Sequence, residues 1–300
     1  IALEVAYPLI AIVLILTLWG VYTQIINLKS QYFVVKGIAA LRNIDSESSD
    51  ERKAYVGQIA AGFFWRAYQL DPTNGRAEFF HGFALTKKNT YEDVVAGTEH
   101  LEEGQLLYPQ SDTFYALAMG YEARRNLAQE QADATRNQIS VLEGDMERAP
   151  TDEEREAIRS EIDQLNIELA EYGADVSYSR QKAIESYMTA AQYYPVKVEY
   201  YKELLRLLEE EGRYADMIFW AERALVVDDW LLKKPPIRWQ LYLWLGRSHR
   251  ALSATDMQEG NYEQAVEHLE AAEEALLAGI ELSRTVYYTY YELGQVNEAL

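Results

Sequence analysis

A short pattern of small and large apolar residues recurs along most of this 300-residue chain. It places a small residue, a large apolar residue, a second small residue and a proline at offsets of about 0, 4, 7 and 12, beginning at Ala60, Phe64, Ala67 and Pro72. The first three offsets put their residues on one face of a helix, and the proline ends that helix. The frame recurs, in weaker form toward the C-terminus, at Gly97, Leu101, Gly104 and Pro109; Ala183, Tyr187, Ala190 and Pro195; Met217, Ala221, Ala224 and Asp229; and Ala265, Leu269 and Ala272.

A second helical pattern precedes these frames, in which an aromatic residue is followed by leucine and then by a small residue. Its occurrences are Phe80, His81 and Gly82; Phe114, Leu117 and Ala118; Tyr201, Leu204 and Leu205; Tyr242, Leu245 and Gly246; and Tyr290, Leu293 and Gly294. Repeated helical spacing of this kind is typical of stacked helix pairs. The sequence therefore predicts an all-α chain in which small residues let the two helices of each pair approach closely.

These paired patterns resemble the tetratricopeptide repeat (TPR) family, whose unit is a 34-residue helix-turn-helix. The segments YLWLGRSH at 242–249 and NYEQAVEHLEAA at 261–272 carry the resemblance most clearly. The resemblance covers about residues 30 to 300, with about six units, and implies a right-handed TPR solenoid.

One unit is interrupted, because Pro109 and Pro195 are separated by about 52 residues more than one 34-residue period. Thr151 and Glu154 form a capping box that restarts a helix within this interval. Apolar stripes lie on either side, at Ile139, Leu142 and Met146 and at Ile158, Ile162, Leu165, Leu169 and Tyr172. We expect an antiparallel coiled-coil hairpin at 126–178, which divides the solenoid into 29–125 and 179–300. The hairpin is either a solvated projection or an arm that grips a neighbouring subunit.

The N-terminal segment is apolar enough to cross a membrane. From residue 5 to 26 its only polar side chains beyond Tyr and Trp are Thr17, Thr23 and Gln24, and this length spans about 33 Å as a helix. Trp19 and Tyr22 lie where an interfacial aromatic belt would place them. We expect a transmembrane helix within 1–28; the alternative is a buried helix of a soluble core.

The topology of that helix is open at this stage. Lys29, Lys36 and Arg42 follow the span, which taken alone would place the large domain in the cytoplasm. Because the chain opens at Ile1 instead of Met, we expect that residues precede it, and the acidic, cysteine-free domain also suits an extracytoplasmic location. The favoured interpretation is a single-pass bacterial membrane protein with its large domain in the periplasm or at the cell surface.

Two further resemblances offer alternatives to a membrane-anchored TPR scaffold. An apolar first helix with an early acid, Glu4, resembles type IV pilins, which implies a filament subunit whose N-terminal helices pack together around Glu4, Trp19 and Tyr22. A last span followed by TPR units resembles the C-terminal extracytoplasmic region of O-antigen ligase-like membrane enzymes, and the end at Leu300, inside a first helix, favours a fragment.

Composition and motifs argue against catalysis in this chain. Nucleic acid is not an expected partner at a net charge of −20, and the absence of cysteine excludes thiol chemistry and cysteine-ligated metals. P-loop, dinucleotide-binding and hydrolase motifs are also absent. His81 and His249 fall at framework positions, and the spacing of His100 and His268 predicts no metal cluster. We therefore expect no catalytic residue, metal or cofactor.

The resemblance to TPR proteins assigns partner binding to the first helix of each unit, which lines a concave groove. Basic residues are frequent at these positions for such an acidic chain, and they suit an acidic or C-terminal peptide carboxylate. The alternative is that Lys202 pairs with Glu199, and Arg206 with Glu209 or Glu210, within their own helix. The predicted groove residues are Arg76, Phe79, Phe83, Lys87, Tyr115, Met119, Lys202, Arg206, Leu243, Arg247, Arg250, Tyr288 and Tyr291.

Tyrosine is unusually frequent, with 23 residues against 8 phenylalanines. We assign Tyr187, Tyr201, Tyr242 and Tyr290 to packing between helices. Tyrosines without a framework role, among them Tyr200 and Tyr287, are expected to contact protein partners.

Overall fold

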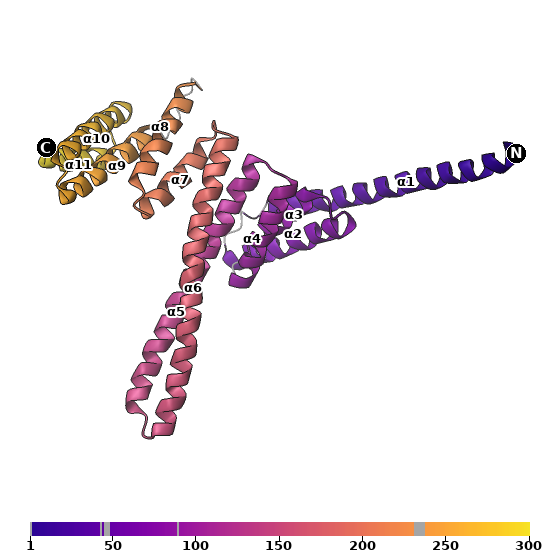
Figure 1. The fold of residues 1–300 in the computed structure, drawn as a ribbon, viewed down its shortest axis with the longest axis horizontal. Coiled ribbons are helices and arrows are strands. Elements are labelled where there is room, and N and C mark those ends of the chain that lie inside the picture. Colours follow the sequence, from indigo (N-terminus) through magenta and orange to yellow (C-terminus); the bar gives the residue numbers. More distant parts are fainter. Residues whose placement is uncertain (1, 43, 45–48, 89, 231–237) are drawn as a thin grey trace. The chain divides into compact units, whose positions relative to one another are not determined.

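A computed structural model describes residues 2–42, 44, 49–88, 90–230 and 238–300, and these contain helices, turns and bends without any strand. The prediction of an all-α chain is confirmed. The chain divides into two compact units, Ile1–Ala183 and Ile184–Leu300, which are described separately. The helices (Figure 1) are α1 Ala2–Leu41, α2 Asp50–Leu70, α3 Gly75–Leu85, α4 Tyr91–Leu107, α5 Ser111–Arg148, α6 Asp152–Tyr193, α7 Val198–Glu210, α8 Tyr214–Trp230, α9 Arg238–Glu259, α10 Tyr262–Leu282 and α11 Tyr287–Ala299.

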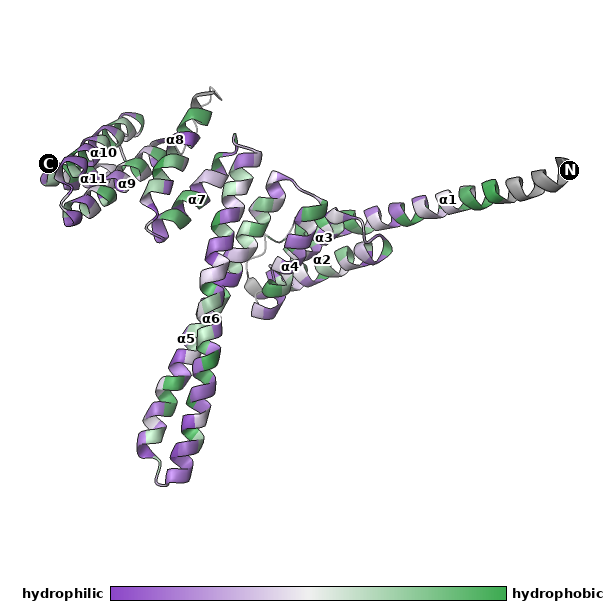
Figure 2. Ribbon diagram, in the orientation of Figure 1, coloured by the Kyte–Doolittle hydropathy of each residue, from purple (hydrophilic) through white to green (hydrophobic). Residues whose placement is uncertain are grey.

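The N-terminal apolar segment forms the first part of one uninterrupted helix, α1. Among the described residues, the stretch Ile12–Leu41 is the one helix long and apolar enough to cross a membrane. Figure 2 shows the apolar part of α1 beyond the rest of the first unit. The C-terminal part of the same helix packs against α2, so the apolar segment continues directly into the first helix pair.

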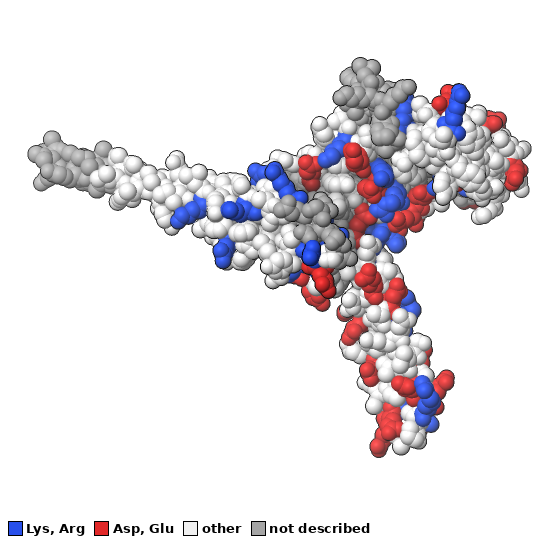
Figure 3. All heavy atoms as spheres, turned by 180° about the vertical axis from the view of Figure 1, so that it is seen from behind, with Lys and Arg blue, Asp and Glu red and all other residues white. Residues whose placement is uncertain are grey.

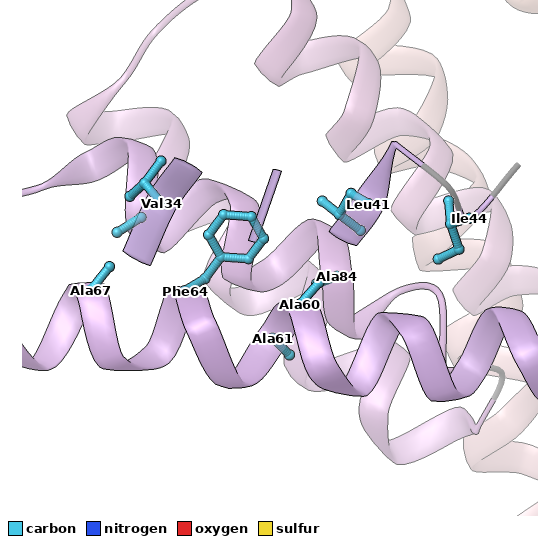
Figure 4. Packing of buried hydrophobic residues seen from close by; sticks show 9 residues of the cluster. Val34, Leu41, Ile44, Ala60, Ala61, Phe64, Ala67 and Ala84 are labelled. Carbon is cyan, nitrogen blue, oxygen red and sulfur yellow. The ribbon is translucent and has the colours of Figure 1, made fainter. Parts of the chain in front are cut away.

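The core of the first helix pair is built around Phe64. Val34 of α1, Ala60 and Ala67 of α2 and Ala84 of α3 are buried around this ring (Figure 4). Gly37 faces Phe64 so closely that a β-carbon there would lie 2.5 Å from the ring. The predicted frame of small residues around a central aromatic residue therefore describes this core.

Glycines set the close approach of α3 and α4. A β-carbon on Gly82 would lie 2.6 Å from the carbonyl oxygen of Gly97, and one on Gly104 would lie 2.7 Å from the backbone of Phe79. Backbone meets backbone at these points, so no larger residue fits without moving a helix. The predicted role of small residues in close helix packing is confirmed for this pair.

Two long helices, α5 and α6, project together as a hairpin (Figure 1). The amide of Glu154 donates to Thr151 Oγ1 at 3.2 Å, which is one of the two hydrogen bonds of the predicted capping box. Every residue of the two predicted apolar stripes is buried or half-buried, and Ile139 and Ile162 are the most buried. Acidic and basic side chains are mixed over the surface of the hairpin (Figure 3).

The second unit continues the pairing of consecutive helices. Helix α7 packs on α8, α9 on α10, and α10 on α11. Gly246 of α9 meets Leu276 of α10, where a β-carbon would lie 2.5 Å from Leu276 Cγ. Leu269, Ala272, Leu276 and Val296 form a buried cluster between α10 and α11. Alternation of helix pairs thus gives both units a TPR-like architecture.

The structure corrects part of the tyrosine assignment. Tyr187 and Tyr201 are buried as expected, but Tyr200 is also fully buried. Tyr200 and Tyr201 lie side by side on one broad buried face of α7, together with Leu204, Leu205, Leu207 and Leu208. Tyr290, assigned to packing, is 46% exposed.

Candidate functional site

In each unit, the predicted groove residues are carried by the odd-numbered helices. Helix α3 contacts both α1 and α5 in the first unit, and α9 contacts α11 in the second. All the predicted groove residues lie on α3, α5, α7, α9 and α11, except Lys87, which follows α3 directly. They fall into a first-unit set (Arg76, Phe79, Phe83, Lys87, Tyr115 and Met119) and a second-unit set (Lys202, Arg206, Leu243, Arg247, Arg250, Tyr288 and Tyr291).

The first-unit set is mainly aromatic and partly internal. Phe79 is only 5% exposed, and its ring stacks on Phe83 with centroids 6.4 Å apart. Lys87 Nζ lies 4.8 Å from the centre of the Phe83 ring, a cation–π contact. Tyr115 and Met119 are half-buried and Arg76 is exposed. Phe79 is therefore a packing residue, Arg76 is the exposed member of this set, and Phe83 and Lys87 are half-buried like Tyr115 and Met119.

The second-unit set contains an ion-pair network centred on Glu292 of α11. This carboxylate is 5% exposed and accepts hydrogen bonds from Arg247 Nε at 2.9 Å and from Arg250 Nε at 3.1 Å. Arg247 also donates through Nη1 to Glu209 of α7 at 2.9 Å. One carboxylate thus holds two guanidinium groups from successive turns of α9, and Arg247 joins α7, α9 and α11.

A pocket of about 180 Å³ opens at this network. Its walls are Glu209, Tyr214, Arg247, Arg250, Ala251 and Glu292. Arg247, Arg250 and Glu209 keep about a third or more of their side-chain surface exposed, whereas Glu292 does not. Buried Glu292 therefore fixes the positions of the two arginines from the interior side of the pocket, whereas the partly exposed Glu209 pairs with Arg247.

Arg206, another charged member of the second-unit set, forms ion pairs within its own helix. Arg206 pairs with Glu203 at 3.1 Å and with Glu210 at 2.6 Å on its own helix, so the predicted i, i+4 pair with Glu210 is present. Glu209, the other predicted partner, pairs with Arg247 instead. Lys202 is exposed.

The apolar members of the second-unit set differ in their exposure. Leu243 packs against the buried cluster of α10 and α11. Tyr288 and Tyr291 are 64% and 51% exposed on α11. The two tyrosines are thus available on the surface, whereas Leu243 belongs in part to the core.

Histidines that sequence spacing did not connect lie together in two pairs. His81 of α3 and His100 of α4 have ring centroids 4.5 Å apart, and His100 Nδ1 lies 2.6 Å from Glu78 Oε1. Burial lowers the pKa of His81 to about 4, with a further contribution from His100, while the hydrogen bond to Glu78 raises the pKa of His100. The sequence predicts no metal cluster because His100 and His268 lie on distant helices. In the structure, the neighbours of His100 are Glu78 and His81 of α3, which is the first helix of its own pair.

The second histidine pair lies in the second unit. His249 Nδ1 and His268 Nδ1 are 3.0 Å apart, and His268 Nε2 is 3.6 Å from Asp256. Burial, and then the neighbouring His268, lower the pKa of His249. His100 and His268 occupy the same position of the repeated frame, three residues after Gly97 and after Ala265. This shared position is the sequence signal that could have predicted a histidine pair in both places.

The N-terminal residues predicted to pack in a membrane or filament are only partly described. The side chain of Glu4 lies outside the described residues. Trp19 and Tyr22 are 66% and 57% exposed on α1, with ring centroids 6.3 Å apart.

TPR proteins are among the solved structures that are similar to this chain. No protein-family model and no curated protein matches the chain. The MamA protein is similar with a TM-score of 0.39 and 14% identity, over 82% of this chain and 95% of that one. YrrB, described as a TPR protein with an unusual peptide-binding site, has a TM-score of 0.37 and 12% identity, over 85% of this chain and 96% of that one. The human IFIT1 dimer, solved with m7Gppp-AAAA, has a TM-score of 0.25 and 12% identity, over 90% of this chain and 68% of that one. Likeness at this level assigns neither a family nor a ligand.

Proposed function

We propose that this chain is a membrane-anchored scaffold that binds protein partners through the odd-numbered helices of its second unit. The observation that carries the proposal is the pair of arginines held by buried Glu292 beside an open pocket. Two guanidinium groups fixed by one carboxylate present their remaining N–H donors without losing much side-chain freedom on binding. A carboxylate of an acidic or C-terminal peptide is the ligand that suits such donors.

In this proposal, the Glu209 carboxylate competes with the peptide carboxylate for Arg247. It accepts from Arg247 at 2.9 Å and keeps a third of its side-chain surface exposed, so a peptide carboxylate would replace it on Arg247. Glu292 is almost fully buried and stays in place as the support. Exposed Tyr288 and Tyr291 on α11 supply aromatic contact area.

The test uses acidic fluorescent peptides with either a free or an amidated C-terminus, and fluorescence anisotropy with the full chain in detergent. Glu209→Gln removes the competitor and should tighten binding, whereas Arg250→Gln should weaken it at least tenfold. Glu211→Gln, an exposed residue just after α7, is the charge-matched control. Equal affinity for all three variants would refute a carboxylate site, and equal affinity for free and amidated ends would refute recognition of the C-terminus alone.

The anchor is assigned to the apolar part of α1, where large side chains such as Leu14, Leu16 and Leu18 are all more than half exposed. Exposed apolar surface of this extent is stable in hydrocarbon and not in water. Alkaline carbonate should therefore leave the chain in the membrane fraction, and replacing Leu14 and Leu16 by lysine should release it. Protease accessibility in sealed vesicles then decides on which side the TPR-like units lie.

A filament subunit remains the second candidate, favoured by the continuity of α1 from its apolar end into the first helix pair. Polymer sheared into the medium, with a processed and methylated N-terminus by mass spectrometry, would establish it. A discrete complex extracted by detergent would establish the scaffold. A native chain extended by further membrane spans would instead place these residues in a larger membrane protein, such as an O-antigen ligase-like enzyme.

We assign no catalytic function to the chain, and we propose protein rather than nucleic acid as its partner. A formal net charge of −20 opposes binding to the negatively charged phosphate backbone of nucleic acid. The α5–α6 hairpin is proposed as an assembly arm. Its Arg136, Arg148, Arg155 and Arg159 pair within their own helices and are exposed, so they provide a mixed-charge surface for a neighbouring subunit.

A further inference from the structure

The facing surfaces of α3 and α4 carry two related sequences, Glu78-Phe-Phe-His81 and His100-Leu-Glu-Glu103. A spacing of three residues places both members of each sequence on the same face of a helix. The two helices run in opposite directions and are held together by the close contacts of Gly82 with Gly97 and of Gly104 with Phe79. Glu78 of α3 is therefore brought beside His100 of α4.

Three of these side chains converge on one point. The ligand atoms of Glu78, His100 and Glu103 all lie within 4.8 Å of one another, and His100 Nδ1 is 2.6 Å from Glu78 Oε1. Burial falls in steps along the cluster, since Glu78 is 1% exposed, His100 is half-buried and Glu103 is exposed. A small ion would thus reach the buried carboxylate from solvent through Glu103.

A second observation singles out this cluster, namely buried polar atoms without a hydrogen-bond partner. Glu78 Oε2 has none, although the side chain is almost completely buried. His81 Nδ1 also has none, and the His81 side chain is 8% exposed with its ring against His100. A buried carboxylate oxygen left unpaired is costly, and a bound cation satisfies it.

We propose that Glu78, His100 and Glu103 form a binding site for a divalent transition-metal ion of the Zn²⁺ class. Imidazole and carboxylate ligands suit Zn²⁺, which takes four ligands at about 2.0 to 2.2 Å from N and O. Three protein ligands leave a position for water, with His81 beside the site. Two carboxylates neutralise the ion, so the charge buried at Glu78 is compensated. The ion would fasten α3 to α4.

The ion would compete with a proton on His100. Only neutral imidazole is a metal ligand, so the ion and a proton exclude each other on the same nitrogen of His100. Glu99, near His100, adds to the negative potential, while Lys88, near His81, reduces it. The site should therefore bind metal more weakly as the pH falls.

The test is isothermal titration of ZnCl₂ into the full chain, purified in detergent without a polyhistidine tag and treated with a chelator. Co²⁺ absorption gives an independent view of the ligand geometry. Because Glu103 is exposed, Glu103→Gln leaves the fold intact and should lower Zn²⁺ affinity about tenfold or more. Glu92→Gln is the matched control, since it is an exposed acid about two turns away on the same helix with the same charge change.

One Zn²⁺ per chain, weakened by Glu103→Gln and His100→Gln and unchanged by Glu92→Gln, is the expected result. Binding that Glu103→Gln leaves unchanged would overturn the proposal, as would the absence of saturable binding. Loss of binding in His268→Gln alone would also overturn it, because the ion would then belong to the His249 and His268 pair.

Discussion

Arg124 of α5 donates to both carboxylate oxygens of Asp175 of α6, from Nε at 2.9 Å to each oxygen and from Nη2 to Oδ1 at 2.5 Å. The Tyr91 hydroxyl of α4 donates to the same carboxylate at 2.8 Å. Burial, followed by this hydrogen bond, raises the pKa of Tyr91 to about 12. Since the Arg124 and Asp175 side chains are 16% and 10% exposed, this contact joins α4, α5 and α6 where water screens it weakly.

Replacing Asp175 by asparagine should loosen the α5–α6 hairpin where it meets α4. The substitution leaves Arg124 mostly buried without its charge partner, so we expect a loss of about 2 to 4 kcal/mol in the free energy of local opening. Hydrogen exchange of the amides around residues 91, 124 and 175 measures it. Asp133→Asn breaks an exposed pair with Arg136 and should change exchange by less than about 0.5 kcal/mol. Similar effects of the two variants would contradict a structural role for Asp175.

The glycine contacts predict opposite effects for two identical substitutions. Gly82→Ala adds a β-carbon 2.6 Å from the Gly97 carbonyl oxygen, so α3 and α4 must separate. We expect a loss of about 1 to 3 kcal/mol in the free energy of unfolding despite alanine's higher helix propensity. Gly62→Ala on α2 meets open space and should gain about 0.5 to 1 kcal/mol. Denaturant unfolding followed by circular dichroism compares the two, and destabilisation by both would show that the helix approach is not the cause.

The first histidine pair predicts a stability maximum near neutral pH for α3 and α4 in the presence of a chelator. The pKa of His81 falls from 6.5 to about 4 on folding, so the unfolded chain binds the extra proton and stability is lost as the pH drops from 6.5 toward 4, by about 3 kcal/mol at most. The pKa of His100 is raised, so its contribution is complete below 6.5 and is lost as the pH rises through that higher value. Hydrogen exchange of α3 against pH tests both limbs. His81→Gln should remove the acid limb alone, and an unchanged acid limb would assign it to another group.

Much of the fold could be predicted because its signal is local. The frame of Ala60, Phe64, Ala67 and Pro72 specifies a helix face and a helix end within a few residues of sequence, and the structure places these residues as expected. The cap at Thr151 is equally local. Tyr200 was misassigned although it precedes the buried Leu204 and Leu207 by four and seven residues, so the apolar spacing within α7 already contained this signal.

The candidate sites were less predictable because they depend on contacts between helices. The predicted groove residues included Arg247 and Arg250, but their common partner Glu292 lies more than 40 residues away on another helix. Likewise, Glu78 and His100 are 22 residues apart and meet only because α3 and α4 fold back on each other. Helical periodicity shows which residues share a face, but the register between two helices is fixed by packing at positions such as Gly82 and Gly97.

Glu292→Gln should loosen the contact between α11 and α9. The variant removes the negative charge that Arg247 and Arg250 share, and because these side chains are 33% and 40% exposed, solvent reduces the expected cost to about 1 to 2 kcal/mol. Faster amide exchange within α11 and earlier proteolytic cleavage near residue 285 measure the effect. Glu298→Gln, an exposed acid on the same helix, is the matched control. Unchanged exchange in Glu292→Gln would mean that Val296 and its apolar neighbours hold α11 without the ion pairs.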